Sequence, residues 1–225
     1  MPRLLLFDID NTLLWSGGAG ALAMGLAFRD LFGIDDGFKG VEFSGRTDCY
    51  ILAEALRQHD IGDDYAQHED HFRERYYGYL PQALRERQGK LMPGFPMLLE
   101  ELSRRPGIRL GLATGNFSRS AHLKLAHFGI DGYFRGGAFG EESEDRSVIV
   151  RLALERLGEG LSPAEVMVIG DTPHDISSAK ACGTIAVGVA TGRNTVDELR
   201  RCGADLVFDD FSDWRRVAAT LSAEP

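Results

Sequence analysis

Short, predominantly apolar runs recur along the chain, and such runs are typical of strands buried on both faces of a parallel sheet. They lie at residues 4–7, 108–113, 166–169, 184–190 and 206–208. Segments with apolar residues at helical spacing lie between them. Strands that alternate with helices predict right-handed crossovers, and therefore an α/β fold with a doubly wound, Rossmann-like parallel sheet as its core.

Helix start and stop signals support this alternation. Ser118 is placed to cap a helix that Gly129 would end, and residues 162–165 and 195–198 each have the spacing of a capping box. The first of these boxes has Pro163 at the first helical position, which suits a short helix.

Residues 15–90 have a different pattern from the rest of the chain. Ala21, Met24 and Phe28 repeat at helical spacing, and no convincing buried strand occurs in this stretch. We therefore predict an α-helical cap domain at 15–90, inserted into a catalytic core domain made of 1–14 and 91–225.

Composition and charge narrow the class of protein. The 225 residues are 44% hydrophobic, and 25 basic against 34 acidic residues give a net charge of −9. This acidity argues against nucleic acid or an anionic membrane as the main partner, but not against a small anionic substrate. The early apolar run is too short for a signal peptide or a membrane span, and the three cysteines are scattered, so we expect a cytoplasmic protein. Monomer and homodimer both stay open.

Two acidic residues follow the first predicted strand. Side chains alternate along a strand, so Asp8 and Asp10 are expected to point the same way. Adjacent carboxylates repel each other unless a cation, a proton or a hydrogen-bond network stabilises them. The carboxyl end of a parallel strand is also where ligands bind in such folds. The alternative is an ordinary turn at Asp10-Asn11.

A second acidic pair follows the strand at 166–169. Pro173 suits the first turn of a helix that Asp171 or Thr172 could cap, and Asp175 lies one turn beyond Asp171. This pair alone would be an acidic helix start. Together with Asp8 and Asp10 at a neighbouring strand end, it predicts a hard-oxygen site suited to Mg²⁺.

A third strand, at 108–113, ends in Thr114-Gly115-Asn116. A hydroxyl, exposed backbone N–H groups and an amide make a reasonable phosphate cradle, although these residues are also common in turns.

The three motifs in this order resemble those of the haloacid dehalogenase superfamily of phosphohydrolases. The resemblance covers nearly the whole chain, with the Asp-x-Asp-x-Thr motif at Asp8, Asp10 and Thr12, a second motif at Thr114 and a fourth at Gly170-Asp171 and Asp175. The helical insertion resembles the cap that this family places between its first two motifs.

The resemblance implies roles for these residues. Asp8 would be the nucleophile that forms an aspartyl-phosphate, and Asp10 would protonate the leaving oxygen and then activate water. Mg²⁺ would be held by the carboxylates of Asp8 and Asp171 and by the backbone carbonyl of Asp10, with Asp175 as a further ligand or as support. Thr114, with Gly115 and Asn116, would bind the phosphoryl group.

The third motif departs from the commonest pattern, which has a lysine before the helix that precedes the fourth motif. Residues 141–147 contain no lysine, and Arg146 is their only cation, so we assign the cationic role to Arg146. The alternatives are a surface arginine paired with Glu144 or Asp145, or a catalytic role for Lys124 instead.

The predicted cap contains one notable loop, residues 43–48. It resembles the cap loop of phosphoglycolate phosphatase-like members, which implies that Ser44 and Arg46 contact substrate. Capping of the next helix by Thr47 or Asp48 is expected in either case.

The leading interpretation is a Mg²⁺-dependent phosphatase acting on a small phosphorylated metabolite, with 2-phosphoglycolate as the best single candidate. Phosphomutase or phosphonate hydrolase chemistry, the latter needing a cap lysine such as Lys39, and a phospho-acceptor signalling domain are the alternatives.

Overall fold

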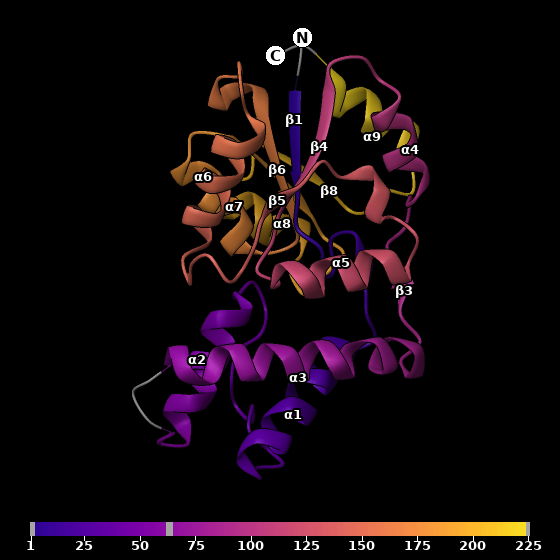
Figure 1. Ribbon diagram of the computed structural model, residues 1–225. Coiled ribbons are helices and arrows are strands. Elements are labelled where there is room, and N and C mark those ends of the chain that lie inside the picture. Colours follow the sequence, from indigo (N-terminus) through magenta and orange to yellow (C-terminus); the bar gives the residue numbers. More distant parts are fainter. Residues whose placement is uncertain (1–2, 62–64, 224–225) are drawn as a thin grey trace.

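The computed structural model describes residues 3–61 and 65–223, and within them it has a parallel sheet flanked by helices on both faces (Figure 1). Six strands form this sheet in the order β5-β4-β1-β6-β7-β8, all parallel. They are β1 (Arg3–Phe7), β4 (Ile108–Ala113), β5 (Gly137–Ala138), β6 (Val166–Gly170), β7 (Ile185–Val189) and β8 (Leu206–Phe208). The predicted doubly wound α/β core is confirmed.

The two faces of the sheet are covered by different helices, because neighbouring side chains of a strand point to opposite faces. Leu5 and Phe7 pack in one buried cluster, whereas Leu4 and Leu6 pack in another. The first cluster includes residues of α4 (Met97–Ser103), α5 (Ser118–His127) and α9 (Trp214–Ser222). The second includes residues of α6 (Arg146–Leu157), α7 (Pro173–Ala181) and α8 (Val196–Arg201). Two 3₁₀ turns, η1 (Asp131–Tyr133) and η2 (Pro163–Glu165), complete this part of the chain.

Three helices lie apart from the sheet, in the lower part of the molecule in Figure 1: α1 (Ala19–Phe32), α2 (Asp48–Gln58) and α3 (Tyr65–Glu86). They share a further buried cluster, in which Phe28, Leu52 and Tyr76 are packed and which Phe117, just before α5, also joins. Leu14–Trp15 (β2) and Lys90–Leu91 (β3) pair antiparallel, so the chain enters and leaves this helical layer at adjacent points. The division into a core of 1–14 and 91–225 and a cap of 15–90 stays a prediction.

Several predicted caps are present. Thr172 and Thr195 begin α7 and α8 with capping boxes, residues 162–165 form the short capped turn, and Thr47 accepts a hydrogen bond from Tyr50 at the start of α2. The prediction that Ser118 caps α5 is wrong, because Ser118 is the first helical residue and Phe117 at the cap position offers no side-chain acceptor. Among the described residues, no helix is long and apolar enough to cross a membrane.

Candidate active site

The site lies where the three central strands end. The register pairs Phe7 of β1 with Leu112 of β4 and with Ile169 of β6, so the residues that follow these strands emerge side by side. Asp8, Thr114 and Asp171 each come directly after one of these strands. The order of strands thus brings together three motifs that lie more than fifty residues apart along the chain.

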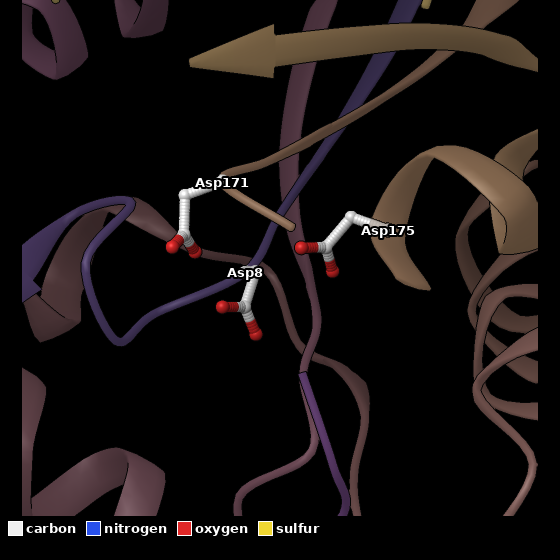
Figure 2. A group of neighbouring side chains, drawn as sticks. All are labelled: Asp8, Asp171 and Asp175. Carbon is white, nitrogen blue, oxygen red and sulfur yellow. The ribbon is translucent and has the colours of Figure 1, made fainter. Parts of the chain in front are cut away.

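Three carboxylates converge at this edge of the sheet. Asp8, Asp171 and Asp175 each offer an oxygen, and these oxygens all lie within 4.8 Å of one another. Figure 2 shows Asp8 at the end of β1, Asp171 at the end of β6 and Asp175 on the first turn of α7, with their carboxylates turned toward a common space. All three side chains are buried.

Burial makes the charged forms of this cluster costly. Burial raises the pKa of Asp171 to about 8, and repulsion from Asp175 and Asp8 adds to the shift. The pKa of Asp8 is raised to about 6, again chiefly by burial, although the Arg146 guanidinium opposes the shift. A cluster of carboxylates with such raised pKa values is stabilised by bound cations or protons.

The donor set fits a hard divalent cation. Asp171 accepts a hydrogen bond from the Thr12 hydroxyl at Oδ1, while its buried Oδ2 has no hydrogen-bond partner among the described residues. A buried, unpartnered carboxylate oxygen facing two further carboxylates has the chemistry of a Mg²⁺ ligand.

Asp175 has more hydrogen-bond partners within the protein than Asp171 has. Its Oδ2 accepts hydrogen bonds from the Thr172 backbone N–H at 3.0 Å and from the Thr172 hydroxyl at 2.7 Å, and its Oδ1 accepts from Arg146. Gly170 leaves the space for this arrangement, because a Cβ at this position would lie 2.2 Å from the Asp175 carboxyl carbon. Both oxygens of Asp175 are therefore engaged within the protein.

Arg146 is buried inside the site and is not a surface residue. It lies at the start of α6 with 8% of its surface exposed, and its guanidinium is 3.3 Å from Asp8 Oδ1 as well as bonded to Asp175. The alternative of a surface pair with Glu144 or Asp145 is wrong, because the side chain is buried against the acidic cluster instead. The acidic neighbours raise the pKa of Arg146 despite its burial, so it stays charged.

The loop after β4 forms one wall of the site. The Thr114 hydroxyl accepts hydrogen bonds from the Asn116 backbone N–H and side-chain amide, and its influence on the neighbouring carboxyl opposes the rise in the pKa of Asp8. Gly115 lies against the backbone of Arg46, so that a Cβ at this position would be only 2.4 Å from the Arg46 carbonyl oxygen. The predicted phosphate-cradle residues are therefore next to the predicted nucleophile.

Asp10 lies at the same strand end, but its side chain is outside the three-carboxylate cluster. Its Oδ2 accepts a hydrogen bond from Asn116 Nδ2 at 2.9 Å and pairs with Lys124 Nζ at 2.6 Å. Lys124 lies on α5, is 4% exposed and also donates to Asn116 Oδ1. Lys124 is predicted from the sequence only as an alternative to Arg146, whereas the structure places both cations at the strand ends.

A cavity of about 380 Å³ opens over these groups, between the sheet edge and the helical layer. Its lining includes the predicted site residues Asp8, Asp10, Ser44, Arg46, Gly115, Asn116, Arg146 and Asp171. Arg46 pairs with Glu42 at 2.8 Å and lies 4.7 Å from the ring centre of Tyr50, so its side chain is partly held at the cavity wall. Trp15 is 45% exposed and also lines the cavity.

Asp48 joins the helical layer to the loop after β4, a contact that sequence reasoning missed. Its backbone N–H donates to the Gly115 carbonyl at 2.7 Å, and its Oδ2 accepts from the Phe117 N–H at 2.8 Å and from the Ser120 hydroxyl at 3.3 Å. A carboxylate of Glu141 accepts from the Ser118 N–H. Two acidic residues from outside α5 thus satisfy its first N–H groups, which explains why Ser118 need not act as the cap.

Comparisons with known proteins agree with this geometry. The family model for haloacid dehalogenase-like hydrolases matches residues 2–183. A phosphoglycolate phosphatase from Rhodospirillum rubrum is 30% identical over 95% of this chain and 91% of its own length, and one from Vibrio vulnificus is 27% identical over 93% of both.

Solved structures share the fold. CbbY from Rhodobacter sphaeroides, crystallised in complex with phosphate, superposes with a TM-score of 0.72 at 23% identity, covering 95% of this chain and 96% of its own. A hydrolase from Pseudomonas syringae gives a TM-score of 0.71 at 22% identity, covering 98% of this chain and all of its own. With the ordered motifs, the sheet topology and the family match in agreement, the chain belongs to the haloacid dehalogenase-like hydrolases.

Proposed function

We propose that this hydrolase is a Mg²⁺-dependent phosphatase that releases inorganic phosphate from a small phosphorylated metabolite through an aspartyl-phosphate on Asp8. The observation that carries the proposal is the convergence of Asp8, Asp171 and Asp175 with Arg146 in one buried cluster at the strand ends. Similarity to curated phosphatases supports the enzyme class.

Asp8 is the nucleophile in this proposal. Its carboxylate attacks phosphorus, the bond between phosphorus and the ester oxygen breaks, and an acyl phosphate forms on Asp8. Arg146 contacts Asp8, and Thr114 follows the strand beside the one that Asp8 follows; in the proposal both stabilise charge on the phosphoryl oxygens. Asp10 gives a proton to the departing oxygen and then takes one from the water that attacks the acyl phosphate, whose bond to the Asp8 oxygen breaks to release inorganic phosphate.

Asp8, Asp171 and the backbone carbonyl of Asp10 would hold the Mg²⁺, and the unpartnered Oδ2 of Asp171 supports this assignment. The ion, when bound, offsets the charge of the carboxylates and of the phosphoryl group. Asp175, whose oxygens bond to Thr172 and Arg146, supports the ligands and orients Arg146.

The substrate enters through the cavity between the sheet edge and the helical layer, where Ser44 and Arg46 are placed to contact its leaving group. 2-Phosphoglycolate is the first compound to test, because the curated relatives include phosphoglycolate phosphatases. Schiff-base chemistry on Lys39 has no support, since this residue is exposed and does not line the cavity.

The test is phosphate release from a panel of phosphorylated metabolites, including 2-phosphoglycolate, with Mg²⁺ and with chelator. We expect turnover that needs Mg²⁺ and falls by more than about 10³-fold in Asp8→Asn, as for the loss of a nucleophile. Asp35→Asn is the matched control, because this carboxylate is exposed and lies outside the site. Normal turnover by Asp8→Asn would overturn the proposal, and return of the phosphoryl group to a sugar phosphate would indicate a mutase.

A further inference from the structure

Lys124 is a buried cation whose contacts differ from those of Arg146. Its Nζ lies 2.6 Å from Asp10 Oδ2 and bonds to Asn116 Oδ1, and no contact with Asp8, Asp171 or Asp175 occurs within the described residues. Arg146 contacts Asp8 and Asp175 but not Asp10. Lys124 and Arg146, both buried, therefore bond to different carboxylates.

Lys124, Asn116 and Asp10 form a closed hydrogen-bonded group. The Asn116 amide donates to Asp10 Oδ2 at 2.9 Å and to the Thr114 hydroxyl at 3.0 Å, while its carbonyl accepts from Lys124. Each member thus contacts the other two, and the group is tied to the strand end through Thr114. Such closed groups restrict side-chain rotation more than single hydrogen bonds do.

Both donors act on the same oxygen of Asp10. Lys124 and Asn116 bond to Oδ2, whereas Oδ1 has no hydrogen-bond partner among the residues the structure describes. The Asp10 side chain is 37% exposed and lines the cavity, so its free oxygen is open to a bound ligand.

We propose that Lys124 is a positioning residue for proton transfer: together with Asn116 it fixes Asp10 through Oδ2, and so leaves Oδ1 to exchange the proton with the leaving oxygen and with water. This inference rests on the proposed phosphatase function. In the first step the proton on Oδ1 moves to the ester oxygen as the bond to phosphorus breaks. In the second step Oδ1 takes a proton from the water that attacks phosphorus, the bond between phosphorus and the Asp8 oxygen breaks, and phosphate leaves. Lys124 takes no part in either proton transfer.

Substrates that differ in their need for a proton test this role. The nitrophenolate of p-nitrophenyl phosphate departs readily without protonation, whereas phenolate needs it more. We expect Lys124→Met to lower kcat/KM for phenyl phosphate by about 10²-fold, within the range of general acid catalysis, and for p-nitrophenyl phosphate by less than about 10-fold. kcat/KM is the right measure because it reports the step in which the leaving group departs.

A double-mutant cycle strengthens the test. If Lys124 acts through Asp10, then adding Lys124→Met to Asp10→Asn costs little more than Asp10→Asn alone. Lys124→Gln retains an amide donor and should recover part of the loss with phenyl phosphate, and it provides a second variant if Lys124→Met unfolds. Lys180→Met is the matched control, because Lys180 is a half-exposed lysine paired with Asp205 at the surface.

The outcomes separate the two proposals. An equal loss for both aryl phosphates, or effects of Lys124→Met and Asp10→Asn that multiply, would overturn the role of Lys124 and indicate a direct contact with the phosphoryl group. Full activity of Lys124→Met with phenyl phosphate would overturn it as well. Activity in Asp8→Asn would instead overturn the proposed function, whatever Lys124 does.

Discussion

Asp171→Asn is expected to stabilise the metal-free protein while abolishing its response to Mg²⁺. Burial and the neighbouring carboxylates raise the pKa of Asp171 from 3.8 to about 8. The folded protein therefore keeps this proton after the unfolded chain has lost it, so stability falls as pH rises from 3.8 toward about 8. An asparagine at this position is neutral in both states and does not contribute this loss.

The size of the effect follows from the shift. One pKa unit corresponds to about 1.4 kcal/mol, so ionisation of Asp171 lowers the unfolding free energy of the wild-type protein by about 4 kcal/mol as pH rises from about 4.5 to 7.5. The buried amide of Asp171→Asn loses hydration, at about 1–3 kcal/mol, but this cost does not change with pH. The difference in unfolding free energy between variant and wild type should therefore rise by about 4 kcal/mol in favour of the variant over this range.

The assay is urea unfolding of chelator-treated protein at the two pH values, with Asp35→Asn as the exposed control. Mg²⁺ at neutral pH should then stabilise the wild type and leave Asp171→Asn unchanged, because ligand binding to the folded state alone raises stability. If the difference in unfolding free energy between Asp171→Asn and wild type does not change with pH, then ionisation of Asp171 does not destabilise the folded protein, and the reasoning is refuted.

Three further results are expected. Mg²⁺ affinity, measured by calorimetry, should fall as pH drops from 8 to 6, because protons on Asp8 and Asp171 compete with the ion. Burial raises the pKa of Asp48 to about 6, so the unfolding free energy of Asp48→Asn relative to wild type should rise by about 2 kcal/mol between about pH 4.5 and 6 and then stay constant. A rise in this difference that continues above pH 7 in urea unfolding would contradict the prediction. Phe117→Ala should cost about 3–5 kcal/mol of unfolding free energy, because this fully buried ring packs against Tyr76 and Tyr77 of α3.

The strands that hold the site could be predicted because their signals are local. The runs predicted for β1 and β6 are apolar throughout, and the run predicted for β4 is interrupted only by Arg109. Polar residues follow each strand directly, and the structure starts or ends the strands within one residue of the predicted bounds. The motif residues at their ends could be found for the same reason. Parallel pairing then brings these ends together without further information from the sequence.

Other elements carry weak local signals. β5 has only two residues, and its pairing with β4 depends on the sheet already being formed. α4 has seven residues and no side-chain cap, so its pattern is too short to recognise. α9 did carry a signal, because Asp213 caps it and Val217 and Leu221 are one turn apart, and this helix could have been predicted.

The remaining site contacts could not be predicted because they depend on where side chains on helices point. Lys124 lies mid-helix on α5, and whether it reaches Asp10 depends on the angle at which α5 packs across the sheet edge. Asp48 contacts the loop after β4 only because the helical layer lies against it. Such contacts depend on tertiary packing, which the spacing of residues in the sequence does not contain.

The local charges show how an acidic protein with a net charge of −9 can receive a phosphate. The acids in this group are Asp8, Asp10 and Asp171, which follow strands, and Asp175 on the first turn of α7; Arg146 and Lys124 are the buried cations bonded to them. When all four acids are ionised, the sum is four negative and two positive charges, or −2. A divalent cation brings this group to zero, and a proton on Asp10 makes it positive. The proposed requirement for Mg²⁺ is therefore electrostatic as well as chemical: without the ion, the same carboxylates that prepare the nucleophile would repel the substrate.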